Sequence, residues 1–200
     1  VWAGLAFDAG GSAIGAGGFL VSTDGGDTFA ERSVPLDNPA DTTITYGGST
    51  LPAVPITEQA GSAARDIAIG GEDTVWVAGT RSGLRRTVDQ GESWSRVVLP
   101  PDTSARIEPS GSYEFLVAPP QGGGRGFRNH EVLSVLVDET GTVWAGTLAG
   151  VNRSSPSDVA PNGDRAWRLY RPDGTPGSLT GQIVMGLAEQ PRPGRNPVWM

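Results

Sequence analysis

The sequence predicts an all-β protein built from repeated antiparallel units of four strands each. Short runs of β-branched and aromatic residues alternate with turn-forming stretches, and the 30 Gly and 16 Pro of the chain lie between apolar runs. A Val-Trp pair recurs within such runs at residues 1–2, 75–76, 143–144 and 198–199. This recurrence indicates a repeat architecture, and the unequal spacing indicates insertions between the units.

The most complete unit spans residues 65–99. Its apolar runs are separated by segments rich in Gly, Asp, Ser and Arg, which favour turns. The unit is therefore expected to be one antiparallel sheet, with strands at Asp66–Ile69, Thr74–Gly79, Leu84–Val88 and Trp94–Leu99.

An eight-residue turn motif occurs at residues 22–29 and again at 87–94. An Asp carboxylate in a tight turn accepts backbone N–H bonds, a Gly tolerates positive φ, and a terminal aromatic covers the sheet beneath. Both segments resemble the Asp-box, Ser/Thr-x-Asp-x-Gly-x-Thr/Ser-Trp/Phe, of sialidase-type (BNR) β-propellers. The resemblance implies structural roles for Ser22, Asp24, Gly26, Thr28, Phe29, Thr87, Asp89, Gly91, Ser93 and Trp94.

The Val-Trp pairs and the two turn motifs also locate the other repeat units. Residues 1–34 predict a partial blade, with its second, third and fourth strands at Val1–Gly4, Gly18–Ser22 and Phe29–Val34. Two long inter-blade insertions follow the first and second blades, at 35–64 and 100–129, and the second has a strand-like piece at Tyr113–Ala118.

A further complete blade is predicted at residues 130–171, where the Asp-box is degenerate and its turn lengthened. Its strands are expected at His130–Val137, Thr142–Thr147, Val151–Ser154 and Ala166–Arg171, and residues 182–200 begin another blade with a strand at Gln182–Glu189. The total is about three and a quarter blades, whereas closed propellers have about four to eight. We therefore expect a segment of a larger propeller, whose remaining blades would be its partners.

The blade at 130–171 carries a second resemblance. Residues 139–153, 167–170 and 178–183 look like the repeat of periplasmic sensor propellers from bacterial two-component regulators, with Val151 in place of the usual Leu and Gly181-Gln182 where Asn is common. The resemblance implies a propeller fold and an exported bacterial protein, extracellular or periplasmic. It specifies fold better than function, since propellers serve as binding proteins, sensors and hydrolases.

Composition excludes several classes of function. All 15 basic residues are Arg, and 22 acidic residues leave a net charge of -7, which argues against nucleic acid and anionic membranes as partners. The absence of Cys excludes thiolate chemistry and Cys-bound metals, and with one His a zinc site is not expected. No cofactor or metal is predicted, and no apolar run approaches the roughly 18 residues of a membrane span.

Function is predicted in the loops around the channel mouth, because loops on a rigid scaffold commonly carry binding sites. Both insertions are expected on this face, and polar residues entering the inner strands would surround the mouth and hold a glycan or small molecule by hydrogen bonds. These candidates are Arg65, Asp66, Arg128, His130, Glu131 and Gln182. For His130, a structural role as a surface histidine bonded to Glu131 or a carbonyl is the simpler interpretation.

The main functional prediction is a non-catalytic binding or sensory module. The alternative is part of a secreted glycoside hydrolase, sialidase-like or xyloglucanase-like, which needs two carboxylates about 5 to 9 Å apart. Asp66 and Glu131 are weak catalytic candidates. Phe127-Arg128 matches only the start of the sialidase Phe-Arg-Ile-Pro motif, and the three Tyr residues lack a companion Glu in a recognisable setting.

Overall fold

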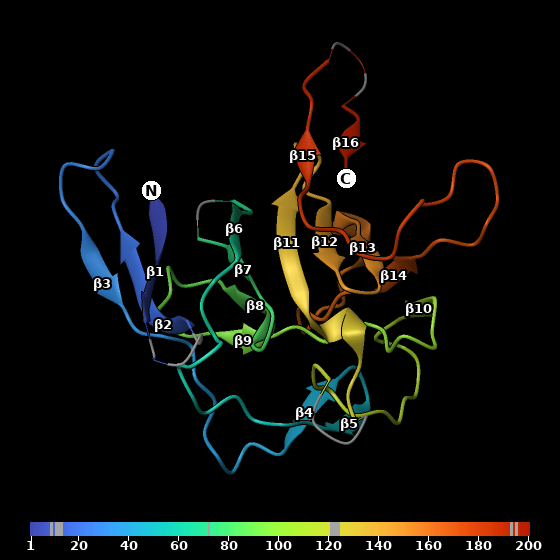
Figure 1. Cartoon of the computed structure of the whole chain (residues 1–200), viewed down its shortest axis with the longest axis horizontal. Coiled ribbons are helices and arrows are strands. Elements are labelled where there is room, and N and C mark those ends of the chain that lie inside the picture. The colour runs from blue at the N-terminus through green and yellow to red at the C-terminus, as the bar shows by residue number, and fades with distance from the viewer. Residues whose placement is uncertain (9, 11–13, 72, 121–124, 193, 195) are drawn as a thin grey trace.

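The computed structural model is all-β and describes residues 1–8, 10, 14–71, 73–120, 125–192, 194 and 196–200. Three antiparallel sheets stand side by side as consecutive propeller blades (Figure 1). Blade one has the order β1-β2-β3. Its strands are β1 (Trp2–Asp8), β2 (Ile14–Val21) and β3 (Ala30–Arg32).

Blade two is the central sheet, and its four strands pair in chain order. They are β6 (Asp66–Ile69), β7 (Val75–Gly79), β8 (Gly83–Thr87) and β9 (Ser95–Arg96). Every residue of β7 is buried, because this strand is covered on both faces. Val75 and Val77 pack with Phe19 of blade one, whereas Trp76 and Ala78 belong to the core shared with blade three.

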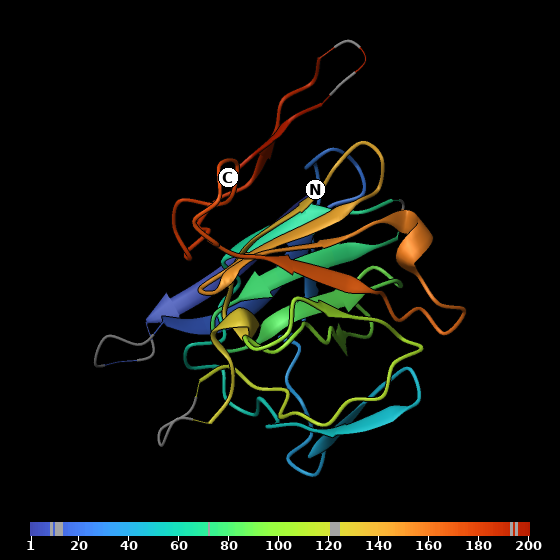
Figure 2. The ribbon, with the colours of Figure 1, turned by 90° about the vertical axis from the view of Figure 1, so that its right-hand side faces the viewer.

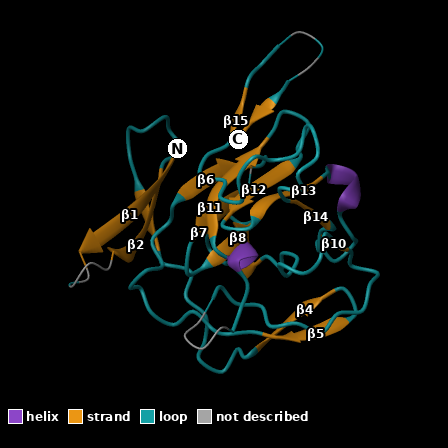
Figure 3. Ribbon diagram, turned by 45° about the vertical axis from the view of Figure 1, so that its right-hand side comes forward, coloured by secondary structure: helices purple, strands orange, loops and turns teal. Residues whose placement is uncertain are grey.

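Blade three is a sheet of five strands rather than the four predicted. Its strands are β11 (Val132–Val137), β12 (Val143–Thr147), β13 (Gly150–Ser154), β14 (Trp167–Tyr170) and β10 (Arg106–Ile107). The last of these comes from the insertion at 100–129 and pairs with β14 at the outer edge. Two short 3-10 helices, η1 (Arg128–His130) and η2 (Pro156–Asp158), flank this blade (Figure 3).

The insertion at 35–64 contains a β-hairpin that the sequence analysis missed. Strands β4 (Thr43–Tyr46) and β5 (Ser49–Pro52) are joined by Gly47 and Gly48, a two-residue connection of the kind that favours hairpins. Gly47 has φ +55°, and a Cβ there would clash with the Pro109 carbonyl. The hairpin brings Tyr46 and Leu51 into the main core.

The insertions do not gather over the channel mouth as predicted. Their middle parts lie against the outermost strands of blades two and three (Figures 1 and 2). Arg96 of β9 donates to the carbonyls of Val54 and Val117, at 2.8 and 3.0 Å, and so joins both insertions to blade two. They pack here because apolar residues of both, such as Leu51 and Ile107, complete the core.

A buried ion cluster anchors the first insertion. Asp37 accepts from Arg85 at 2.8 Å and from Arg96 at 3.4 Å, and its carboxylate also accepts the N–H of Ile56 at 2.8 Å. The Arg85 side chain is only 3% exposed. Its charge would be costly to bury without Asp37.

Three other strand predictions were wrong. The strand predicted at Trp94–Leu99 is reduced to β9, two residues long. Within Tyr113–Ala118, the described pairing is a single bridge between Val117 and Ala53. The strand predicted at Gln182–Glu189 is reduced to β15 (Ala188–Glu189), which pairs with β16 (Val198–Trp199) in a hairpin away from the other sheets. Most of the stretch from 182 to 187 is exposed, and its described backbone hydrogen bonding to blade three is a single bond, from the Val184 N–H to the Thr147 carbonyl at 3.0 Å.

The two Asp turns close on themselves. Asp89 accepts the backbone N–H and the hydroxyl of Ser93 at 2.9 and 2.6 Å, and the Thr87 hydroxyl at 2.7 Å. Thr87 in turn accepts the N–H of Gly91 at 2.8 Å. The same four bonds recur in the turn at 22–29. These bonds hold the pKa of Asp89 at about 2, below its usual range.

The aromatic residues that end the two turns differ in burial. Trp94 stacks on Phe19, with ring centroids 5.3 Å apart, and meets Trp2 edge-on at 6.1 Å. It therefore helps to join blades one and two. Phe29 remains 49% exposed, so the sealing role predicted for it is not observed.

Candidate ligand-binding site

Asp66 acts in the structure as a link between blades. Its carboxylate accepts the N–H of Ile67 and, from the neighbouring blade, the N–H of Val135, both at 2.9 Å. Strands β6 and β11 are thereby tied at the positions where the blades are closest. Arg65, next to it, is exposed, and its backbone N–H bonds to Ala78.

His130 is not placed to bind a ligand. It is 5% exposed, and its Nδ1 and Nε2 lie 3.1 Å from the N–H of Ala118 and 3.0 Å from the carbonyl of Leu99. Nδ1 also lies 3.0 Å from the Ala118 carbonyl, which already accepts the Phe127 N–H at 2.9 Å. A neutral ring that accepts at Nδ1 and donates at Nε2 therefore satisfies the Ala118 N–H and the Leu99 carbonyl, and burial lowers its pKa. The cavity beside it is only about 10 Å³. The carbonyl bond was predicted correctly, but the surface position and the mouth-binding role were not.

The other candidates lie at the surface. Arg128 and Gln182 are exposed, and Glu131 is partly buried. Burial raises the pKa of Glu131, and nearby Arg128 opposes that shift. Arg128 begins η1 and Glu131 follows its last residue, so the two side chains are close enough to interact electrostatically.

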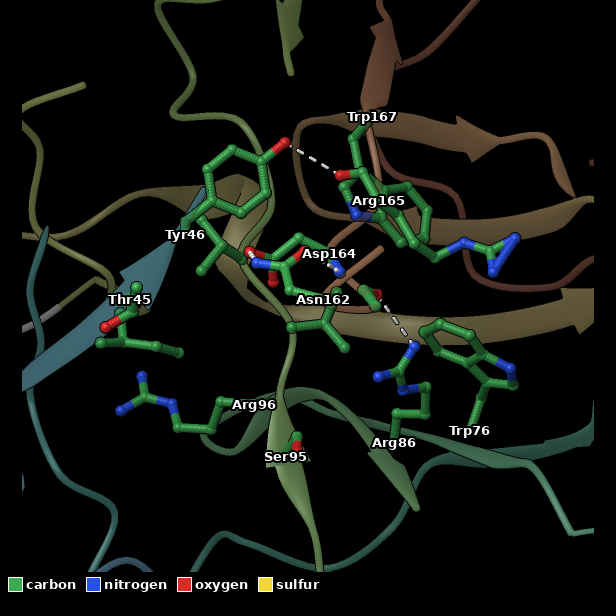
Figure 4. A pocket seen from close by; sticks show the side chains of 14 residues that line it. Thr45, Tyr46, Trp76, Arg86, Ser95, Arg96, Asn162, Asp164, Arg165 and Trp167 are labelled. Carbon is green, nitrogen blue, oxygen red and sulfur yellow. Dashed lines mark hydrogen bonds between the residues drawn. The ribbon is translucent and has the colours of Figure 1, made fainter. Parts of the chain in front are cut away.

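A larger pocket lies elsewhere, between blades two and three at the outer rim. It has a volume of about 330 Å³ and is closed on one side by β4 of the inserted hairpin (Figure 4). Blade two contributes Arg86, Ser95 and Arg96, and the long turn before β14 contributes residues 162–165. Ser95 and Asn162 are exposed, so the pocket opens to solvent.

Two arginines from different blades converge on one aromatic ring of this pocket. The guanidinium carbons of Arg86 and Arg165 lie 5.7 and 5.4 Å from the Trp76 ring centroid, within cation–π range. Arg86 also donates to the Gly163 carbonyl at 3.1 Å, and Arg165 donates to the Ser154 hydroxyl at 3.1 Å. Burial lowers the pKa of both guanidinium groups.

The opposite wall is held by bonds between distant segments. The Tyr46 hydroxyl donates to the Arg165 carbonyl at 2.9 Å, and Asp164 accepts the N–H of Gly47 at 2.7 Å. Burial raises the pKa of Tyr46 well above its usual range, so this hydroxyl keeps its proton. The pocket wall is therefore preorganised by the hairpin and the long turn together.

The sequence analysis did not identify Arg86, Arg165 or Asp164. Two signals were available in the sequence. One is the long turn between η2 and β14, and the other is the Gly47-Gly48 pair of the hairpin opposite it. Neither feature shows from sequence alone that the two segments meet.

No protein-family model matches the chain, and a search of curated proteins finds no match. Among solved structures, the extracellular domain of the putative hybrid two component system BT4673 from B. thetaiotaomicron aligns at 16% identity and a TM-score of 0.37. The alignment covers 88% of this chain and 22% of that one. The fold assignment rests on the strand pairings described above.

In the part of the chain that the structure describes, no helix is long and apolar enough to cross a bilayer. In the same part of the chain, no group of three or more acidic or histidine side chains is arranged to hold a metal ion.

Proposed function

We propose that this chain is a non-catalytic binding or sensory β-propeller module of an exported bacterial protein. The observation that carries the proposal is the pocket between blades two and three. Its walls offer guanidinium, amide and hydroxyl groups from Arg86, Arg165, Asn162, Thr45 and Ser95. Such a set recognises oxygen-rich ligands, including glycans and small organic acids.

The composition of the pocket favours binding over hydrolysis. Asp164 is the one carboxylate on its described wall, and that group accepts the Gly47 N–H and the Asn162 amide, each at 2.7 Å. Glycoside hydrolysis in the usual form requires a second carboxylate across the scissile bond. The pocket therefore supports recognition without bond cleavage.

The hydrolase alternative depends on Asp66 and Glu131. Asp66 already bridges two strands through backbone N–H groups, so its place in the fold is explained without catalysis. The exposed Arg128 and the partly buried Glu131 remain a second candidate surface for the proposed binding function. Arg65 and Gln182 are also exposed and remain proposed ligand contacts at their own positions.

Binding and turnover should be measured on the same ligand panel. We expect the chain to bind at least one member of a glycan and organic-acid array, with no product released from that member. Loss of binding in Arg86→Gln would assign the ligand to the pocket between blades two and three. Loss of binding in Arg128→Gln would assign it to the surface formed by Arg128 and Glu131. Glu114→Gln, at an exposed site away from both, is the control.

The same panel tests the hydrolase alternative. Turnover that disappears in Asp66→Asn or Glu131→Gln but survives in Glu114→Gln would replace the binding proposal by a hydrolase. Removal of the insertions is not a useful test, because Tyr46 and Leu51 are core residues and the shortened chain would lose stability.

A further inference from the structure

The inter-blade pocket contains an excess of positive charge, because Arg86 and Arg165 line it and Asp164 is the one carboxylate on its described wall. Among the described residues, Arg85 and Arg96 form ion pairs with Asp37, whereas Arg86 and Arg165 take part in no ion pair. Both of the latter bond instead to neutral oxygens, a carbonyl and a hydroxyl. The protein has a net charge of -7, so this local excess runs against its overall charge.

Holding these two cations together is unfavourable, and Asp164 and Asp158 attract Arg86 and Arg165 without forming an ion pair with either. They flank the same Trp76 ring from different blades and are partly buried, and Arg86 contributes to lowering the pKa of Arg165. Like charges in a partly desolvated site repel each other more strongly than they would in water. A bound anion would relieve that repulsion.

The same wall holds an additional unused donor. Trp167 is 1% exposed and lines the pocket, and its indole N–H has no hydrogen-bond partner among the residues that the structure describes. Buried polar groups are normally satisfied, so a donor of this kind in a ligand-sized pocket points to an acceptor from outside the chain. This observation is independent of the charge argument.

We propose that the pocket between blades two and three binds a small ligand carrying an oxyanion, either a carboxylate or a phosphate, between Arg86 and Arg165. Guanidinium groups match both oxyanions through paired N–H bonds. Thr45, Ser95 and Asn162 would face the neutral part of the ligand. The volume of about 330 Å³ lies near the lower end of small-molecule pockets, which fits a ligand of monosaccharide size.

The inference rests on the proposed binding function and is tested by calorimetry on the complete chain. The probes are sodium glucuronate, inorganic phosphate and glucose, in a chloride buffer of low ionic strength. We expect saturable binding of at least one of the two anions, and binding of glucose at least tenfold weaker. Tighter binding of glucuronate would identify a carboxylate ligand, and tighter binding of phosphate a phosphorylated one.

Variants separate binding from a structural role of the arginines. Arg86→Gln and Arg165→Gln should each weaken anion binding at least tenfold. Arg168→Gln is the matched control, because Arg168 lies next to Trp167 in β14 but is exposed and stacks on Tyr170, at 5.0 Å. If the arginines only stack on Trp76, the two variants will lower thermal stability while anions bind neither them nor the wild type.

A variant at an exposed site tests the pocket without disturbing the Trp76 stack. Ser95 is exposed and directly opposite Arg86 in the β8–β9 ladder, so Ser95→Tyr should fold and obstruct the pocket. We expect it to reduce anion binding at least tenfold. Unchanged anion affinity in Ser95→Tyr, Arg86→Gln and Arg165→Gln would overturn the proposal.

The failure of this inference is distinguishable from failure of the proposed function. Saturable binding of neutral glycans without binding of either anion overturns the anion site but leaves the binding module intact. Absence of binding across the anions and the whole glycan panel overturns both.

Discussion

The turn after β8 and the turn after β13 occupy equivalent places in consecutive blades but use their aspartates differently. In the compact turn at 87–94, the partners of Asp89 lie within four residues of it. In the long turn, Asp158 forms a capping box with Ser155 at η2, whereas Asp164 binds Gly47 of the inserted hairpin, 117 residues away. The compact turn is self-sufficient, and the long turn depends on tertiary structure.

This difference shows where a binding site arises in the repeat. In the compact turn the motif's polar side chains bond to one another, and its contacts outside its own blade go to blade one, where Arg32 donates to the Gln90 carbonyl and pairs with Glu92. The long turn carries Gly163 and Arg165 across to blade two, where Gly163 accepts from Arg86 and Arg165 reaches Trp76. Lengthening the motif thus converts a closed structural element into one wall of a pocket.

The largest effect is expected at Asp37, which, like Asp164 of the long turn, bonds to residues far away in the sequence. Asp37→Ala should lower the free energy of unfolding by about 3–5 kcal/mol, because it leaves the buried Arg85 charge without a partner. Urea denaturation measures the change. Asp41→Ala, at an exposed position in the same insertion, is the control and should change stability little. Equal, small effects of the two substitutions would show that the ion cluster does not anchor the insertion.

A second test compares the aromatic and the carboxylate of the compact turn. Trp94→Ala should cost about 2–3 kcal/mol, because it removes a partly buried ring that packs on two aromatics of blade one. Asp89→Ala should cost less, because it affects only bonds within an exposed turn. Thermal melts of both variants give the order. A larger loss for Asp89→Ala would mean that the turn bonds, rather than inter-blade packing, dominate.

The third test concerns the long turn directly. Asp164→Ala should cost about 1–2 kcal/mol by leaving the Gly47 N–H without its acceptor, whereas Asp164→Asn retains an acceptor and should cost less. Hydrogen exchange of the Gly47 amide should accelerate in the Ala variant. Protection equal to that of the wild type would show that the hairpin is held by its apolar contacts alone.

The smallest expected effect is a pH dependence from His130. Its folded-state pKa is lowered by burial, so below the unfolded value of about 6.5 the unfolded chain binds a proton that the folded chain does not. Stability should therefore fall as the pH decreases from about 6.5 toward 5. Nitrogen NMR at pH 6.5, where a free imidazole is about half protonated, should show a mainly neutral ring with the proton on Nε2. An imidazole that titrates near pH 6.5 in the folded protein would contradict this assignment.

The strands of the blades were largely predictable, because their determinants are local. The range predicted for β6 matches the observed strand, and β7 and β8 begin or end within one residue of their predicted limits. The Asp turns follow from bonds within eight residues. The hairpin at 43–52 also has a local signal in Gly47-Gly48, and it was missed because the surrounding segment is rich in Pro and Thr.

The candidate site was not predictable in the same way. Arg86 and Arg165 are 79 positions apart, and their side chains meet only because blades two and three pack together around Trp76. His130, in contrast, was predicted as a site residue but is buried. Its sequence position did not decide this, since a polar residue at the start of an inner strand can face either the channel mouth or the interior. Its burial depends on Leu99 and Ala118, which come from other segments.

By itself, the sequence determined the all-β class, the repeat and the self-closing turns, because strand patterning and turn hydrogen bonds depend on residues close together in the chain. Tertiary structure decided that the insertions pack at the outer rim, that Asp66 links blades and that a basic pocket forms between Arg86 and Arg165. These outcomes depend on apolar burial and ion pairing between segments as many as 119 residues apart, as in the bond from Tyr46 to Arg165. Local patterns carry no information about which of those distant surfaces meet.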